Sequence, residues 1–101
     1  MFDYVEFSDV SGESIGHDLK LIALSTCGFC RRAIDFLKEH NISYSNVYID
    51  QQPVHIKQKI KDEFSERFNK KIFYPALIID EEDALIGFTE EVWISNLGLE
   101  K

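Results

Sequence analysis

Long apolar runs and basic residues are both scarce in this chain of 101 residues. No apolar run approaches the roughly 20 residues that a helix needs to cross a bilayer. The N-terminal stretch, residues 1–18, is acidic and lacks the basic start and apolar centre of a signal peptide. We therefore expect a cytoplasmic protein without a membrane partner.

The charge balance argues against a nucleic-acid partner. There are 11 Lys and Arg residues and 18 Asp and Glu residues, which gives a net charge of −7. A surface that binds nucleic acid needs a basic patch to offset the phosphate charge. We expect no nucleic-acid partner, and the acidic balance by itself names no other.

Cysteine is scarce as well, with Cys27 and Cys30 as the two residues, both in the stretch LSTCGFCRRA. Structural disulfides are rare in the cytoplasm, so this Cys-x-x-Cys pair indicates redox catalysis or metal binding. A structural zinc ion needs four ligands. The histidines show no ligand spacing, and they are His17, His40 and His55. A zinc site within one chain is therefore disfavoured, whereas a cluster shared by two chains and simple packing of the thiols stay open as alternatives.

The remaining composition is typical of one globular domain, with 45% apolar and 29% charged residues and no repeat or Pro/Gly-rich linker. Apolar spacing predicts an α/β fold with the order β-α-β-α-β-β-α. The predicted segments are strand 19–25, helix 28–40, strand 43–50, helix 53–69, strands within 74–80 and 84–88, and helix 89–97. The first strand–helix–strand unit should be parallel and the last two strands an antiparallel hairpin. This gives a mixed four-stranded sheet with helices on both faces.

Several residues are expected to mark the ends of these elements. Asp50 is predicted to cap the helix over 53–69, with Pro53 in its first turn, and Thr89 to cap the last helix. Apolar residues recur every four positions along the 53–69 helix and predict its buried face; they are Ile56, Ile60, Phe64 and Phe68. An additional edge strand is expected around YVEF, residues 4–7, followed by a turn at residues 11–12.

Cys27 lies where a predicted strand ends and a predicted helix begins. Free N–H groups and the helix dipole at such a position stabilise a thiolate, which is the reactive form of cysteine. Gly28 is expected to allow a tight turn that keeps this thiol accessible, and Arg31 and Arg32 add positive charge. Cys30 follows one turn later on the same face. The pattern predicts Cys27 as the attacking thiol and Cys30 as the thiol that resolves a mixed disulfide.

Pro75 opens an apolar strand, a position at which proline is tolerated. One interpretation is an ordinary trans proline, because X–Pro bonds are cis in only about 5–6% of folded cases. The other is a cis proline that faces the cysteines and leaves the backbone of Tyr74 free to pair with an extended substrate. Phe29, Tyr74 and Phe88 are predicted to form an apolar docking patch beside the thiols.

Together these features resemble the glutaredoxin branch of the thioredoxin-like superfamily. The resemblance covers about residues 19–97 and rests on CGFC after the first strand, Pro75 before the third and IGF at the end of the fourth. It implies a thioredoxin-like fold, with residues 1–18 as an N-terminal extension and residues 19–101 as the glutaredoxin-like domain. It also implies that Cys27 is the nucleophile, that Cys30 resolves, and that Pro75 is cis.

Three positions differ from the glutaredoxins that use glutathione. Those proteins usually have Lys three residues before the first Cys, where this chain has Leu24, and Thr-Val before the proline, where it has Phe73-Tyr74. They usually have Gly-Gly and an Asp after the fourth strand, where GFTEE supplies Gly87 alone. The pair Gly87-Phe88 is more similar to the glutaredoxin-like redoxins that serve ribonucleotide reductase.

The resemblance implies a dithiol oxidoreductase that reduces protein or small-molecule disulfides without a bound cofactor. Its substrate-binding residues would be Gly28, Phe29, Tyr74, Pro75, Gly87 and Phe88. We expect a monomer whose partners are protein disulfides and a reductase: a thioredoxin reductase, a ferredoxin-linked reductase or the glutathione system, with glutathione as a candidate reductant. The alternative is an iron–sulfur cluster carrier or a redox-sensing binding module. Residues 27–29 match the start of the CGFS motif of monothiol glutaredoxins, with Cys30 in place of their Ser.

Overall fold

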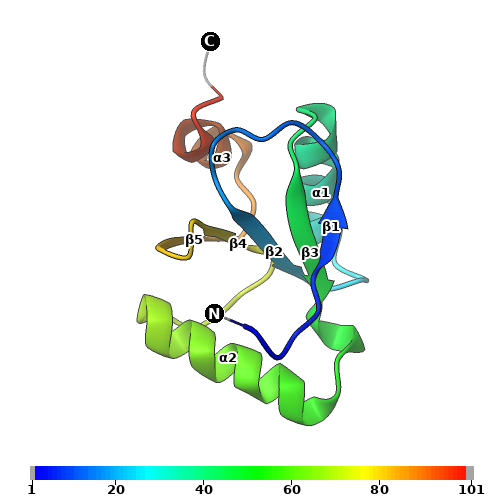
Figure 1. The fold of residues 1–101 in the computed structure, drawn as a ribbon, viewed down its shortest axis with the longest axis vertical. Helices are drawn as coiled ribbons and strands as arrows, with labels where there is room; N and C mark the ends of the chain where they lie inside the picture. The colour runs from blue at the N-terminus through cyan, green and yellow to red at the C-terminus, as the bar shows by residue number, and fades with distance from the viewer. Residues whose placement is uncertain (1, 100–101) are drawn as a thin grey trace.

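The structure, a computed structural model, describes residues 2–99 and is built around a mixed five-stranded sheet. Its elements are β1 (Ser8–Val10), β2 (Leu19–Ala23), α1 (Gly28–Glu39), β3 (Tyr44–Tyr48), the 3₁₀ turn η1 (Ile49–Gln51), α2 (Val54–Phe68), β4 (Ala76–Ile79), β5 (Asp83–Ile86) and α3 (Glu90–Leu97) (Figure 1). The predicted order of strands and helices is confirmed.

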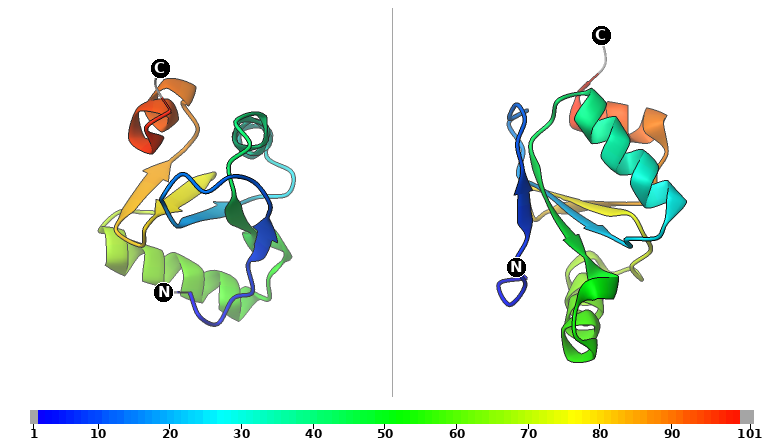
Figure 2. Two further views of the ribbon diagram at one scale, coloured as in Figure 1. Left: turned by 45° about the horizontal axis from the view of Figure 1, so that its top comes forward. Right: turned by 90° about the vertical axis from the view of Figure 1, so that its right-hand side faces the viewer.

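The strands lie in the order β1-β3-β2-β4-β5 across the sheet. β2 and β3 are parallel, as the predicted crossover through α1 requires, and the other three pairs are antiparallel. Figure 2 shows α1 and α3 on one face of the sheet and α2 on the other. The prediction of helices on both faces is therefore confirmed.

The central strands are apolar along their whole length because both of their faces are covered. On β2, Leu21 packs with α1 and α3, while its neighbour Ile22 packs with α2. β4 repeats this alternation with Leu77 and Ile78. The sheet thus separates two cores, and the side of α1 and α3 holds Cys30.

The N-terminal residues extend the sheet and cover the core on the side of α2. An edge strand is present, but it is β1 at Ser8–Val10 and not the YVEF segment, so that detail of the prediction is wrong. Phe2 and Val5 turn inward and are buried against the α2 side. The backbone N–H of Phe2 and the hydroxyl of Tyr4 both donate to Glu63 on α2, at 3.1 and 2.9 Å. Residues that pack inward at this irregular spacing cannot also alternate as a strand.

The start of α2 differs from its prediction. Asp50 lies in η1 and does not cap α2; Pro53 occupies the N-cap position instead. The predicted apolar face is real, with Ile60 and Phe64 buried and the flanking Ile56 and Phe68 partly buried. Within residues 2–99 no helix is long and apolar enough to cross a bilayer.

The last helix begins where the sequence predicts. Thr89 is the N-cap residue of α3, although its hydroxyl makes no capping hydrogen bond. Glu90 and Glu91 lie in its first turn, where the helix dipole favours negative charge. The hairpin before α3 turns at Asp80 and Glu81, both with positive φ, as a tight turn between right-twisted strands requires.

Candidate active site

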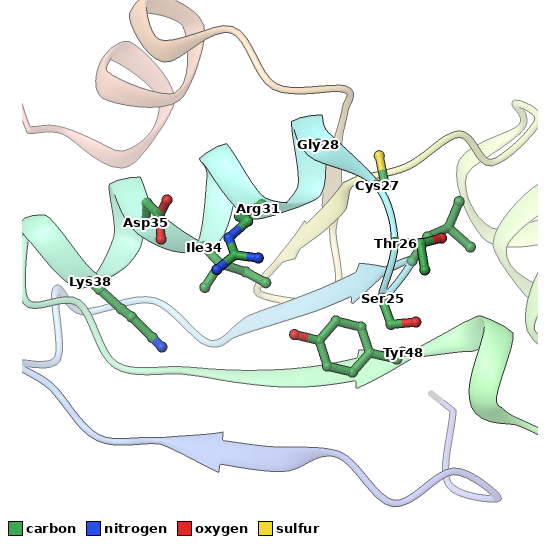
Figure 3. Close-up of a pocket in the computed structure, with 10 residues that line it drawn as sticks. Ser25, Thr26, Cys27, Gly28, Arg31, Ile34, Asp35, Lys38 and Tyr48 are labelled. Carbon is green, nitrogen blue, oxygen red and sulfur yellow. The ribbon is translucent and has the colours of Figure 1, made fainter.

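Cys27 sits at the junction that the sequence indicates. β2 ends at Ala23, a short loop follows, and Cys27 is the N-cap residue of α1 (Figure 3). Its side chain is partly exposed. Cys30 lies on the inner face of α1, is 1% exposed, and accepts a hydrogen bond from the backbone N–H of Leu24 at 3.4 Å. The fold therefore presents one thiol to solvent and encloses the other directly behind it.

The two thiols have opposite acid–base properties. The pKa of Cys27 is lowered, chiefly because the backbone N–H of Cys30 points to its sulfur; burial opposes this effect, and the backbone N–H of Phe29 adds to it. Burial raises the pKa of Cys30 to about 11, and the charges of Cys27 and Asp50 push it in the same direction. A thiolate on Cys27 beside a protonated thiol on Cys30 follows from this difference.

A contact that the sequence did not indicate holds the loop before Cys27. The carboxylate of Asp50 accepts the backbone N–H of Ser25 at 2.9 Å and the Ser25 hydroxyl as well. These two hydrogen bonds lower the pKa of Asp50. Because β2 and β3 are parallel neighbours, the segments that follow them meet at one edge of the sheet. Asp50 thereby positions the loop that carries the exposed thiol.

The segment before β4 lies next to the cysteine loop. β2 and β4 are antiparallel with Ile22 opposite Ala76, and this register continues to bring Leu24 beside Tyr74. The Tyr74–Pro75 peptide bond is cis, as the family resemblance implies. Within residues 2–99 neither the backbone N–H nor the backbone C=O of Tyr74 has a hydrogen-bond partner.

The side chain of Tyr74 points into the protein. It packs against both cores, and its pKa is raised by burial first and by the charge of Cys30 second. Its hydroxyl is buried and has no hydrogen-bond partner among the described residues. The side chain of Tyr74 therefore closes the site on the interior side, near Cys30. Its backbone N–H and C=O stay available to a substrate.

Gly87 and Phe88 support the site from the adjoining hairpin. Gly87 has φ +77°, donates its N–H to Pro75 at 2.8 Å and accepts the indole N–H of Trp93 at 3.1 Å. Phe88 packs its ring against Trp93 and Phe36, with centroids 5.0 and 5.5 Å apart. Both residues tie α3 to the end of β5, and the ring of Phe88 is directed to the core.

Two aromatic rings next to the site are exposed. Phe29, between the cysteines, is 59% exposed, and Phe73, just before Tyr74, is 57% exposed. A cation lies over each ring: Arg32 over Phe29 and Lys71 over Phe73. Phe29 is accessible as expected, whereas the exposed partner on the proline side is Phe73. The position of Phe73 two residues before Pro75 was the signal available in the sequence.

Gly28 is the first residue of α1 and does not have a positive φ. A Cβ built on Gly28 would meet nothing within 4 Å. The backbone at this position therefore does not require glycine. The accessibility of Cys27 follows from its N-cap position instead.

No group of three or more His, Cys, Asp and Glu side chains in residues 2–99 is arranged to hold a metal ion.

The chain matches one family model and several solved structures. The family model described as Glutaredoxin matches residues 19–83. A search of curated proteins gives no match. The glutaredoxin from Methanosarcina mazei is 29% identical, with a TM-score of 0.78 over 93% of this chain and 89% of that one.

Two further solved structures are similar. Methanoredoxin from Methanosarcina acetivorans is 28% identical, with a TM-score of 0.79 over 93% of this chain and 96% of that one. Glutaredoxin 1 from Francisella tularensis, solved as a complex with cacodylate, is 25% identical, with a TM-score of 0.64 over 85% of this chain and all of that one.

Proposed function

Because the chain belongs to the glutaredoxin family, whose general activity is thiol–disulfide oxidoreduction, we propose that it reduces disulfides by a dithiol mechanism through Cys27 and Cys30. The observation that carries this proposal is the asymmetry of the two thiols. One is accessible and has a lowered pKa; the other is enclosed directly behind it and has a pKa of about 11. A nucleophile and a resolving thiol require this division.

The reaction takes two exchange steps. The Cys27 thiolate attacks one sulfur of the substrate disulfide, forms a mixed disulfide and releases the other half as a thiolate, which takes a proton from water. Cys30 then loses its proton and attacks the Cys27 sulfur. This forms the Cys27–Cys30 disulfide, releases the second half as a thiol, and transfers two electrons to the substrate.

The residues around the pair have distinct roles in the proposal. The open backbone N–H and C=O of Tyr74 pair with an extended substrate, and Pro75 keeps this segment beside the cysteines. Phe29 contacts the substrate from α1, and the exposed ring of Phe73 contacts it from the proline side. Small exposed apolar surfaces of this kind suit transient docking.

The three other predicted site residues, Gly28, Gly87 and Phe88, support the backbone around the site. Gly28 contributes its backbone N–H to the open first turn of α1, where negative charge is favoured. Gly87 and Phe88 border the site through the hairpin, and their contacts with Pro75 and Trp93 hold the proline segment in place.

The cycle needs an electron donor and no bound cofactor. We propose a cytoplasmic protein that acts as a monomer on protein or small-molecule disulfides. It would be reduced by a thioredoxin reductase, a ferredoxin-linked reductase or glutathione with its reductase. Disulfide reduction supplied with each donor in turn identifies the one that is used. Glutathione turnover is expected to be weak, because Leu24 and Phe73 replace residues that glutathione-using members of the family usually carry.

Two cysteine variants test the mechanism. Cys27→Ser should abolish turnover. Cys30→Ser should stop the dithiol cycle at the mixed disulfide, which mass spectrometry detects as a covalent adduct on Cys27. A complete dithiol cycle in Cys30→Ser would refute the assignment. Visible absorbance after anaerobic expression, lost in Cys27→Ser, would point to the cluster carrier instead.

A further inference from the structure

The buried hydroxyl of Tyr74 has no role in the two exchange steps given above. It is enclosed by the protein and has no hydrogen-bond partner within residues 2–99. A buried hydroxyl without a partner has lost its hydrogen bonds to water and has gained none in return, so native structures rarely keep one. A partner that is present in only one state of the catalytic cycle would account for its retention.

Tyr74 lies next to the resolving thiol. Tyr74 and Leu24 pack against the cluster of apolar contacts that contains Cys30. Leu24 connects the other two residues: it lies beside Tyr74 in the register of β2 and β4, and its backbone N–H donates to the Cys30 sulfur at 3.4 Å. The charge of an ionised Cys30 reaches Tyr74 and raises the pKa of the phenol, as burial also does. Tyr74 therefore stays protonated, and able to donate, when Cys30 ionises.

The second exchange step requires a thiolate on Cys30 in surroundings that disfavour charge. Cys30 is 1% exposed, and burial is the largest effect that raises its pKa. In the reduced protein the Cys30 thiol donates to Cys27, whose charge raises this pKa further. A mixed disulfide removes that charge, because the Cys27 sulfur is then bonded to the substrate. Burial and the charge of Asp50 remain, and the N–H of Leu24 opposes them.

Resting on the proposed function, we propose that the Tyr74 hydroxyl donates a hydrogen bond to the Cys30 sulfur while this sulfur is a thiolate in the second exchange step. The Cys27–Cys30 bond forms and the bond from Cys27 to the substrate breaks. The substrate sulfur leaves with the electron pair and ends with the proton that Cys30 gave up, whereas Tyr74 keeps its own proton.

The charge on the sulfur decides when this donor is used. A neutral thiol is a weak acceptor, and in the reduced protein Leu24 already donates to it. A thiolate is a strong acceptor, and hydrogen bonds to ionised groups are about twice as strong as neutral ones. The Tyr74 hydroxyl is therefore unpaired in the reduced protein and paired when the charge appears.

Tyr74→Phe removes the hydroxyl and keeps the ring and the backbone. The pKa of Cys30 should rise by about one unit, as expected for the loss of one hydrogen bond to a charged group. The titration is followed through the Cβ chemical shift of Cys30 in the Cys27→Ser background, with and without Tyr74→Phe. A residue that only fills space would leave this pKa unchanged.

The two exchange steps are then timed separately. The reduced protein is mixed with an excess of bis(hydroxyethyl) disulfide and quenched in acid, and mass spectrometry follows the mixed and internal disulfides. Formation of the mixed disulfide on Cys27 should be unchanged in Tyr74→Phe. Its conversion to the internal disulfide should slow about threefold at neutral pH, because the thiolate fraction of Cys30 falls about tenfold while its nucleophilicity rises about threefold.

The matched control is Tyr44→Phe. Tyr44 is a buried tyrosine on β3 in the same cluster. The groups that raise its pKa do not include Cys30. Its substitution should leave both rates and the pKa of Cys30 unchanged. Unfolding in urea shows whether either variant is destabilised.

The outcomes separate the inference from the function on which it rests. An unchanged pKa of Cys30 in Tyr74→Phe, or an equal slowing of both steps, overturns the inference and leaves the dithiol mechanism standing. An equal slowing in Tyr44→Phe also overturns it, as does a clear loss of stability in Tyr74→Phe, because the hydroxyl would then be paired in the reduced protein. If Cys30→Ser forms no mixed disulfide, the proposed function fails and the inference fails with it.

Discussion

Iodoacetamide at neutral pH should modify Cys27 and leave Cys30 unmodified in the reduced protein. Alkylation requires the thiolate, so its rate follows the fraction of each thiol that is ionised. The backbone N–H groups at the start of α1 lower the pKa of Cys27, whereas burial raises that of Cys30. Iodoacetamide therefore reports directly on the asymmetry that carries the proposed function.

The size of the difference follows from the two pKa values. The pKa of Cys27 lies below the ordinary value of 9.0, and that of Cys30 is about 11. Well below both values, each unit of pKa changes the thiolate fraction tenfold. The two-unit gap between 9.0 and about 11 sets a ratio of thiolate fractions of at least about 100 in favour of Cys27. A thiolate of lower pKa is also a weaker nucleophile, so the pKa gap gives a ratio of alkylation rates on the order of 10. Enclosure of Cys30, which is 1% exposed, increases the ratio further.

The assay uses less than one equivalent of reagent, followed by digestion and mass spectrometry to assign the label. The same labelling in a denaturant is the control, because both thiols then have ordinary pKa values and should react alike. The rate for Cys27 should rise with pH with a midpoint below pH 9, because the pKa of this thiol is lowered from 9.0. Comparable labelling of the two thiols in the folded protein, or faster labelling of Cys30, would refute the electrostatic argument.

Three further variants test contacts around the site. Trp93→Ala removes a ring that is 1% exposed and the indole N–H bound to the backbone of the β5–α3 turn, so the free energy of unfolding in urea should fall by about 3–5 kcal/mol; a loss below about 1 kcal/mol would contradict the packing. Tyr74→Phe removes a buried hydroxyl that has no partner in residues 2–99, so stability should stay unchanged or rise by up to about 1 kcal/mol; a clear loss would mean that the hydroxyl is satisfied. Asp50→Asn removes a negative charge that raises the pKa of Cys30. Ultraviolet titration of the thiolate in the Cys27→Ser background should therefore give a lower pKa for Cys30 when Asn is present, and an unchanged pKa would show that the carboxylate does not act on this thiol.

The predictions that succeeded rest on local patterns. The apolar run of β2, the four-residue spacing of Ile60 and Phe64 and the position of Cys27 between a strand and a helix each involve neighbouring residues. Periodicity and cap chemistry are properties of a short window, so a sequence contains them in full. The family resemblance added the cis form of the bond before Pro75, which local spacing did not favour.

The predictions that failed concern residues whose partners are distant in the chain. Asp50 has the chemistry of a helix cap, but its oxygens bind Ser25, 25 residues earlier. The contacts of the Phe88 ring with Phe36 and Trp93 were likewise not indicated by the sequence. An aspartate or a phenylalanine satisfies its oxygens or buries its ring wherever the fold supplies a partner, and a local pattern does not contain that partner.

By itself, then, the sequence determined the order of elements and the placement of two thiols one turn apart at a helix start, because both depend on contiguous residues. Only the tertiary structure decided what distinguishes those thiols. Burial of Cys30 between α1 and the sheet raises one pKa, and the contact of Asp50 with Ser25 holds the loop that carries the other thiol. The burial arises because α1 packs against the sheet, and the contact arises because β2 and β3 pair in parallel, which sets residues 25 positions apart side by side.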